Sequence, residues 1–445
     1  MEHSIAALER RLNDFDARVR RAALEELASL EEDLAEPPFS RAVNLHCHTF
    51  YSFNGYGYSP SYFAWRAKRE GLYAAGIVDF DVLDAVDEFL AACRLIGLRG
   101  CAGIETRVFV PPFQTREINS PGEPGVAYHM GAGFVSSTPK DPALLSRLKT
   151  LAQDRTRGIA NRVNPYLAPA TVDFDTDVLS LTPKGNATER HLCAAYDIKA
   201  RALFPEADAR TAFWTEKLNS DRESVRRVID DPPSLQALIR AKTMKAGGVG
   251  YVPANGPDFP GLDEVNAFTL ENGAIPTFAW LDGTTDGEQA IEELFDVMVA
   301  GGAAAVNVIP DRNWNIKDPA IKAIKLAKLH EFVAMARDRG MPVLAGTEMN
   351  AHGNRFVDDF TAPELEPVIP AFLDGAHILY AHTRLQAHAG MGYLSVWARG
   401  AFANVSDKNA FFRRVGEKLA PSDAVPAALN AAMNRDEAER ALGLK

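Results

Sequence analysis

The sequence has few cysteines, no long hydrophobic run and no excess of positive charge. The cysteines show no zinc-ribbon spacing, and we expect reduced thiols at Cys47, Cys93, Cys101 and Cys193. No apolar run reaches the length of a membrane span. The first residues, Met-Glu-His-Ser, lack the basic and apolar regions of a secretory signal. Together these absences predict a cytoplasmic protein that does not enter a membrane.

The net charge of −11 makes nucleic acid and anionic membranes poor partners for the surface as a whole. It does not exclude a small anionic substrate, because a metal ion or a local group of cations can reverse the field within one pocket. With 445 residues, of which 47% are hydrophobic, the chain is long enough for one large barrel with insertions or for two domains.

From residue 43 onward, short apolar segments alternate with amphipathic helical patterns. We expect strands at 43–48, 73–78, 99–104, 126–128, 274–280, 303–309, 342–347 and 377–381. Several of these segments end in polar or charged residues, as in a parallel α/β barrel, whose chemistry lies at the carboxyl ends of its strands. The order predicts an α/β barrel of about seven or eight strands.

Helical segments interrupt and extend the barrel pattern. Residues 3–35 carry one helical apolar stripe, ended by prolines, that packs on its own domain or joins two copies in a homo-oligomer. The stretch 140–245 shows helical patterns only, which predicts an insertion that forms a lid or an oligomer contact. The predicted parts are an N-terminal helix (1–38), two barrel segments (39–139 and 246–394), the insertion (140–245) and a helical tail (395–445).

Two histidines at alternate positions follow the apolar start of the first strand. In an extended strand, His46 and His48 point to the same side, whereas Cys47 points away. Two neutral imidazoles on one face can bind a divalent cation through their nitrogen lone pairs. Glu105 ends the third strand at the same rim and adds a carboxylate. This pattern predicts a metal site; the alternative is a polar strand end that is hydrogen-bonded to its loop.

The order of these motifs resembles that of the polymerase-and-histidinol-phosphatase (PHP) superfamily. The matching segments are His46-x-His48-Thr49-x-x-Ser52, a strand that ends in Asp79, and Gly103-x-Glu105. The resemblance is close over 43–105 and looser in the later strands. It implies a distorted TIM-like (β/α)7 barrel, divalent ions at its carboxyl end and phosphoester hydrolysis. The metal ligands that it implies are His46, His48, Glu105, His129, Glu348 and Asn350.

Several positions depart from the family pattern. Phe80 and Trp280 stand where the family carries histidine ligands, and neither ring coordinates a metal ion. Glu348 keeps a carboxylate on a longer arm, whereas Asn350 offers an amide oxygen in place of an imidazole. With these losses we expect one or two divalent ions, zinc or manganese or else iron, rather than a cluster of three.

One group of basic residues is a candidate for neutralising an anionic substrate. Lys184, Arg190 and His191 lie beside the start of a predicted helix, for which Asn186 is the expected N-cap. Free amides and the helix dipole attract anions to such a position. An ordinary capped helix with exposed basic residues explains the same pattern, so both interpretations stay open.

The ends of the later predicted strands carry further candidates. His382 is a candidate general acid or base and Arg384 an anion clamp, although structural roles at the rim explain both equally well. Trp280, Asp282 and Arg312 are expected to line the substrate pocket.

These patterns support three functional hypotheses. The first is a metal-dependent phosphoesterase that hydrolyses a small phosphorylated metabolite with a metal-activated water, while Arg190 or Arg384 steadies the charge. The second is an amidohydrolase-like metal hydrolase, for which no metal-bridging lysine is evident. The third is a catalytically degraded barrel that binds a small anion, which Phe80, Trp280 and Asn350 favour.

Overall fold

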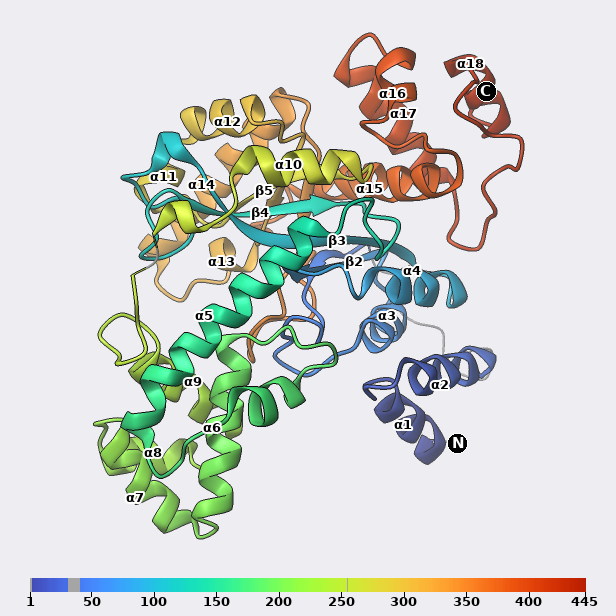
Figure 1. Ribbon diagram of the computed structural model, residues 1–445. Coiled ribbons are helices and arrows are strands. Elements are labelled where there is room, and N and C mark those ends of the chain that lie inside the picture. Colours follow the sequence, from blue (N-terminus) through green and yellow to red (C-terminus); the bar gives the residue numbers. More distant parts are fainter. Residues whose placement is uncertain (1, 31–40, 254) are drawn as a thin grey trace.

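The computed structural model describes residues 2–30, 41–253 and 255–445, with a seven-stranded sheet at its centre (Figure 1). All neighbouring strands are parallel except β4, which runs antiparallel to both β3 and β5. The strands lie side by side in sequence order: β1 Val43–Cys47, β2 Ala74–Phe80, β3 Arg99–Phe109, β4 Val126–Ala132, β5 Ile275–Trp280, β6 Ala305–Val308 and β7 Val343–Ala345.

The sheet curls until the segment after β7 meets β1. The Glu348 N–H donates to the His46 carbonyl at 2.8 Å, and the His48 N–H donates to the Glu348 carbonyl at 2.8 Å. Gly346 permits this approach, because a β-carbon there would lie 2.4 Å from the His46 backbone nitrogen. The nearly closed barrel that results confirms the predicted α/β, TIM-like fold.

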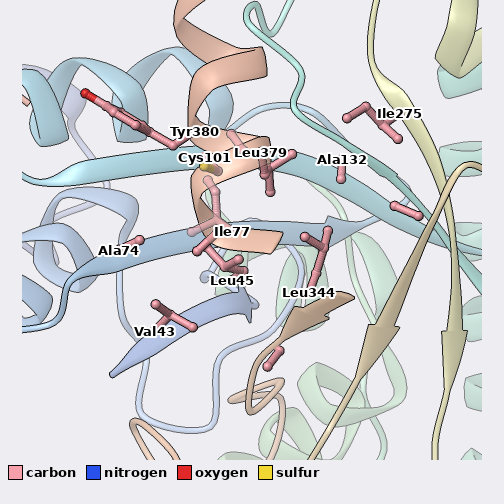
Figure 2. Packing of buried hydrophobic residues seen from close by; sticks show 14 of the residues in the cluster. Val43, Leu45, Ala74, Ile77, Cys101, Ala132, Ile275, Leu344, Leu379 and Tyr380 are labelled. Atoms are coloured by element: carbon pink, nitrogen blue, oxygen red, sulfur yellow. The ribbon is translucent and has the colours of Figure 1, made fainter. Parts of the chain in front are cut away.

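The barrel core explains why most strands could be recognised in the sequence. Strands of a parallel sheet are covered on both faces and are therefore apolar along their length. Every residue of β1, β5, β6 and β7 is buried. Figure 2 shows Leu45, Ile77 and Leu344 of the strands in one cluster with Leu379 and Tyr380 of the helix α15.

Helices cover the outside of the sheet. Those that connect or follow the strands are α3 Pro60–Arg69, α4 Val86–Leu95, α10 Leu262–Glu271, α11 Asp286–Gln289, α12 Ile291–Ala300, α13 Asp311–Trp314, α14 Pro319–Asp338 and α15 Ile369–Ala389. The C-terminal part is helical, as predicted, with α16 Val396–Ala401, α17 Val405–Lys418 and α18 Arg435–Ala441. Within the described ranges, no helix is long and apolar enough to cross a membrane.

The long connection between β4 and β5 is helical, as predicted. It contains α5 Ala143–Leu167, α6 Glu189–Leu203, α7 Ala207–Lys217, α8 Arg222–Val228 and α9 Pro232–Thr243. Buried side chains around Tyr196 and Trp214 give this lobe a hydrophobic cluster apart from the barrel core. In Figure 1, α5 runs from the barrel into the lobe. The boundaries at 140 and 245 stay predictions.

The prediction of one continuous N-terminal helix is wrong. Two helices, α1 Glu2–Arg11 and α2 Ala17–Ser29, are separated by a turn. Asp16 sets the break, because its backbone is extended and its side chain accepts a backbone N–H from the first turn of α2. The predicted end of the helix at Pro37 and Pro38 lies outside the described residues.

A buried arginine joins this helical pair to the barrel. Arg20 of α2 is inaccessible to solvent, and its guanidinium binds the carboxylate of Glu88 on α4. It also donates to the Tyr51 hydroxyl at 3.0 Å and lies 5.1 Å from the centre of the Phe50 ring. Both aromatic residues belong to the loop that follows β1, so the N-terminal helices support that loop directly.

The predicted strand at 377–381 is also wrong, since these residues lie within α15. A short continuous apolar run is compatible with a buried strand and with a buried helix, and periodicity does not separate the two. The helix ends at Ala389 and is capped by Gly390, whose φ of 64° is left-handed and favours glycine. Gly375 lets the helix lie against β7, because a β-carbon there would lie 2.0 Å from the Val343 carbonyl oxygen.

We expect Gly375→Ala to destabilise the fold by about 3 kcal/mol, because the new methyl group meets backbone that cannot move aside. The matched control is Gly400→Ala in α16, where no atom lies within 4 Å of the new β-carbon. There alanine should stabilise the helix by about 0.5–1 kcal/mol. The midpoint of urea unfolding, followed by circular dichroism, measures both effects. Equal midpoints would show that α15 does not pack on β7 as described.

Candidate metal centre

Two histidines and a glutamate converge inside the barrel. The Nε2 atoms of His46 and His48 lie 3.4 Å apart, and the Glu105 Oε2 atom lies 3.3 Å from the first and 2.9 Å from the second. All three side chains are buried. One ligand atom of each residue lies within 4.8 Å of the other two, a spacing that suits a single metal ion. The structure therefore brings these three predicted ligands together.

Strand register places the three side chains on one face. Three residue steps on β1, from Asn44 to Cys47, pair with two steps on β2, so β1 carries a bulge between these two residues, in the span that includes His46. His46 and His48 alternate with Cys47 and therefore lie on the side opposite its thiol. Glu105 pairs with Phe80 on β2, which puts its carboxylate beside His48 at the carboxyl end of the barrel.

The other ring nitrogen of each histidine ligand, Nδ1, also contacts a polar side chain. The His46 Nδ1 atom lies 2.8 Å from the Asn307 Oδ1 atom, and the Asn307 amide nitrogen donates to the Leu344 carbonyl. Since the Asn307 oxygen must accept, the His46 Nδ1 atom carries the hydrogen. The His48 Nδ1 atom lies 3.3 Å from the Ser52 hydroxyl, which donates to Asp79 at 2.6 Å. Both Nε2 lone pairs are thereby left for a metal ion.

The converging ligand atoms need a cation among them. Two Nε2 lone pairs and a carboxylate oxygen repel one another unless they share a proton or a metal ion. Although burial opposes it, the adjacent His46 and His48 lower the pKa of Glu105 to about 2. Burial also disfavours the charged form of His46, yet Glu105 and Glu348 raise its pKa above the ordinary value. A divalent ion fits this set of two imidazoles and one carboxylate.

Asp79 supports the loop after β1 and is fully engaged there. Its carboxylate accepts the Thr49 N–H at 2.7 Å and the hydroxyls of Thr49 and Ser52 at 2.6 Å each. Burial raises the pKa of Asp79, whereas these donors act in the opposite direction. The matching Asp79 and Ser52 motif residues therefore orient His48 rather than add another ligand.

Phe80 occupies the space next to His48. The two rings are stacked, with centroids 4.2 Å apart and an angle of 21° between their planes. The phenyl ring covers one face of the imidazole and offers no lone pair. The number of ions that the site holds stays a prediction.

The predicted ligands Glu348 and Asn350 lie at the same rim but not in the three-residue group. The Glu348 carboxylate accepts two hydrogen bonds from Arg312 Nη2, at 3.0 and 3.2 Å. Glu348 and Met349 both have left-handed backbones, with φ of 64° and 57°. Asn350 follows them, half-buried, and its amide makes no hydrogen bond with any described residue. Their role as ligands stays a prediction.

The prediction that His129 is a ligand is wrong, because its side chain lies on the other face of the sheet. His129 pairs with Thr106, the neighbour of Glu105, and directly opposed residues share a face. Its Nε2 atom lies 2.6 Å from the Asn266 Oδ1 atom on α10. Burial lowers the pKa of His129 to about 4. The pairing of β4 with β3 sets this face, and the sequence alone did not reveal the register.

His382 and Arg384 are also misplaced by the prediction, because the strand that was to carry them is a helix. His382 is buried in α15, where its Nε2 atom donates to the Gly133 carbonyl at 3.0 Å and its Nδ1 atom accepts the Tyr393 N–H at 2.9 Å. Gly133 lies beyond the end of the antiparallel β4, toward the amino ends of the other strands. Arg384 binds the Asp423 carbonyl. Neither residue faces the metal group.

Lys184 and His191, around the start of α6, lie near the loops that follow β1 and β2. Lys184 is exposed and binds Asp84 at 3.0 Å. Asn186 is not the N-cap that we expected; Thr188 caps the helix, and the Asn186 amide donates to the Phe80 carbonyl at 2.8 Å. His191 completes the capping box and is buried.

Arg190 differs from Lys184 and His191 in the partners of its side chain. It is half-buried, and its side chain makes no hydrogen bond or ion pair with any residue that the structure describes. Burial, with a smaller contribution from nearby Arg240, lowers the pKa of its guanidinium. An arginine in such surroundings is suited to receive an anion.

The three residues predicted to line a pocket lie in three different environments. Trp280 is buried on the outer face of the barrel, stacked on Phe332 of α14 at 4.6 Å, so the prediction that it contacts substrate is wrong. Asp282 binds Lys325 at 2.7 Å. Arg312 is half-exposed at the rim beside Glu348 and remains available to a ligand.

Sequence reasoning missed two residues of the inner face. Asn307 sits in the middle of an apolar strand, and a buried asparagine there was a signal that something polar faces it. Tyr128 pairs with Arg107 on the same face as Glu105, and its ring centroid lies 6.2 Å from that of Phe80. Tyr128 immediately precedes His129, to which the prediction gave the role of ligand.

No protein-family model and no curated protein matches this chain. One similar solved structure is an amidohydrolase from Chromobacterium violaceum with bound sulfate and no metal: the TM-score is 0.47 and the identity 18%, over 74% of this chain and 96% of that chain. Another, from Bifidobacterium adolescentis, carries the name of a metal-dependent phosphoesterase: the TM-score is 0.45 and the identity 17%, over 76% of this chain and 98% of that chain.

We expect Asn307→Leu to weaken metal binding about 10- to 100-fold, because His46 loses the acceptor that orients its ring. The matched control is Asn266→Leu, since this buried asparagine holds His129 on the opposite face of the sheet. The affinity of the Asn266→Leu variant for metal should stay at the wild-type value. Competition with a metal chelator measures both affinities. If the two variants lost affinity equally, the loss would reflect general loosening rather than the His46 contact.

Proposed function

We propose that the chain is a metal-dependent hydrolase of the PHP type that acts on a small phosphate ester. The observation that carries this proposal is the convergence of two imidazole nitrogens and one carboxylate oxygen, each oriented so that it can bind an ion. His46, His48 and Glu105 would hold the ion. When bound, it would lower the pKa of a coordinated water and polarise the phosphoryl oxygens. Zinc or manganese suits the mixed nitrogen and oxygen ligands.

The surrounding residues support an anionic substrate. The guanidinium of Arg312 is half-exposed at the barrel rim, and the Arg190 side chain makes no hydrogen bond or ion pair with any described residue. Lys184 adds a third cation beside the loop that follows β1. Bidentate contacts from arginine match the oxygens of a phosphate group. These side chains would bind and orient the ester while the net charge of the whole chain stays negative.

A second candidate is a barrel that binds a small anion without turning it over. Phe80 favours this alternative, because its ring lies against His48 and brings no ligand atom to the site. Both candidates use the same cations, so they differ in turnover and not in the chemical class of the ligand. An amidohydrolase-like activity on C–N or C–O bonds is tested with the same set of ester and amide substrates, described next.

We expect the purified protein to hold divalent metal and to hydrolyse a generic phosphate ester such as p-nitrophenyl phosphate. His46→Ala combined with His48→Ala should remove the metal and reduce turnover at least a hundredfold while the protein still unfolds cooperatively, since apolar layers stabilise the barrel. His388→Ala, an exposed histidine on α15, is the control. Elemental analysis, ester and amide substrates, and thermal unfolding make up the measurement. Bound metal without turnover of any substrate would favour the second candidate, a barrel that binds a small anion without hydrolysing it.

A further inference from the structure

Glu348 lies next to the metal-ligand group, yet its carboxylate is paired with an arginine. Backbone hydrogen bonds to the carbonyl of His46 and from the N–H of His48 fix Glu348 against the strand that carries both ligands. The carboxylate nevertheless points to Arg312 Nη2, at 3.0 and 3.2 Å.

The pair has one protected and one accessible partner. The Glu348 side chain is 10% exposed, whereas that of Arg312 is 44% exposed. A carboxylate that is removed from water needs a positive partner, and removing that partner leaves an uncompensated charge. Arg312 therefore neutralises Glu348 from the solvent side and at the same time presents a guanidinium to the mouth of the barrel.

A divalent ion would meet the same electrostatic need. Glu348 is anchored beside the histidines, and hard carboxylate oxygens bind divalent cations well. The guanidinium already occupies this carboxylate, and Phe80 closes the neighbouring face of His48. The carboxylate that would serve a second ion is thus already paired with a cationic side chain.

We infer that Arg312 takes the place of a second metal ion at Glu348, so that the chain binds one divalent ion and uses Arg312 as the second positive charge facing the substrate. The substrate contact rests on the proposed function; the number of ions rests only on the metal centre. Arg312 is then a specificity-determining residue for an anionic group that bridges the ion and the guanidinium.

The test is the number of manganese ions bound per chain, measured by isothermal titration and by elemental analysis after gel filtration. The wild type should bind one ion. Arg312→Met should bind two, because Glu348 is released as a ligand, and Arg312→Met combined with Glu348→Gln should return to one. Arg355→Met is the matched control: Arg355 is 42% exposed at the same rim and pairs with Asp311, and its loss should leave one ion bound.

Each result separates this inference from the proposed function. Two ions on the wild type, or one ion on Arg312→Met, would overturn the role of Arg312 while the metal centre stands. No metal on any variant would overturn the metal centre itself. If the methionine variant does not fold, Arg312→Gln removes the charge but keeps a hydrogen-bond donor for Glu348, and it should also bind two ions. Turnover of a phosphate ester is measured separately on the wild type.

Discussion

The closure of the barrel between β1 and the segment after β7 is the constraint on which the metal centre depends. Backbone hydrogen bonds join Glu348 to His46 and His48, so the strand that carries the histidine ligands is held on both sides. The contact requires a glycine at position 346, because any side chain there would collide with His46. Fold and site therefore share one set of interactions: what closes the sheet also aims the two imidazoles at Glu105.

The loop after β1 is stabilised from three directions. From β2, the Asp79 carboxylate accepts hydrogen bonds from the hydroxyls of Thr49 and Ser52 in this loop, and the Ser52 hydroxyl in turn contacts His48. On the outside, Arg20 of the N-terminal helices contacts Tyr51. The helical insertion reaches the same region through Lys184, whose ammonium group lies 5.6 Å from the centre of the Tyr51 ring. Parts that are distant in the sequence thus converge on a few residues beside the ligands, which makes the site rigid before any ion binds.

The sequence was sufficient for features that depend on local geometry and insufficient for those that depend on register. His46 and His48 share a face because strands alternate, and Glu105 joins them because carboxyl ends of parallel strands meet at one rim. His129 was wrongly grouped with them, because the register of β4 on β3 pairs it with Thr106 on the outer face, and nothing within the strand announces that register. His382 was misplaced because an apolar run long enough for a strand belongs to a buried helix.

The left-handed backbone at Glu348 has a consequence for how this chain can change. A residue with a β-carbon is strained at a φ of 64°, by about 1 kcal/mol or more, and glycine would relieve that strain. The chain carries a carboxylate there instead, so backbone stability and side-chain chemistry are opposed at this one position. A laboratory selection for heat resistance alone would favour glycine at 348, and the ion pair at the barrel mouth would be among the first features to disappear.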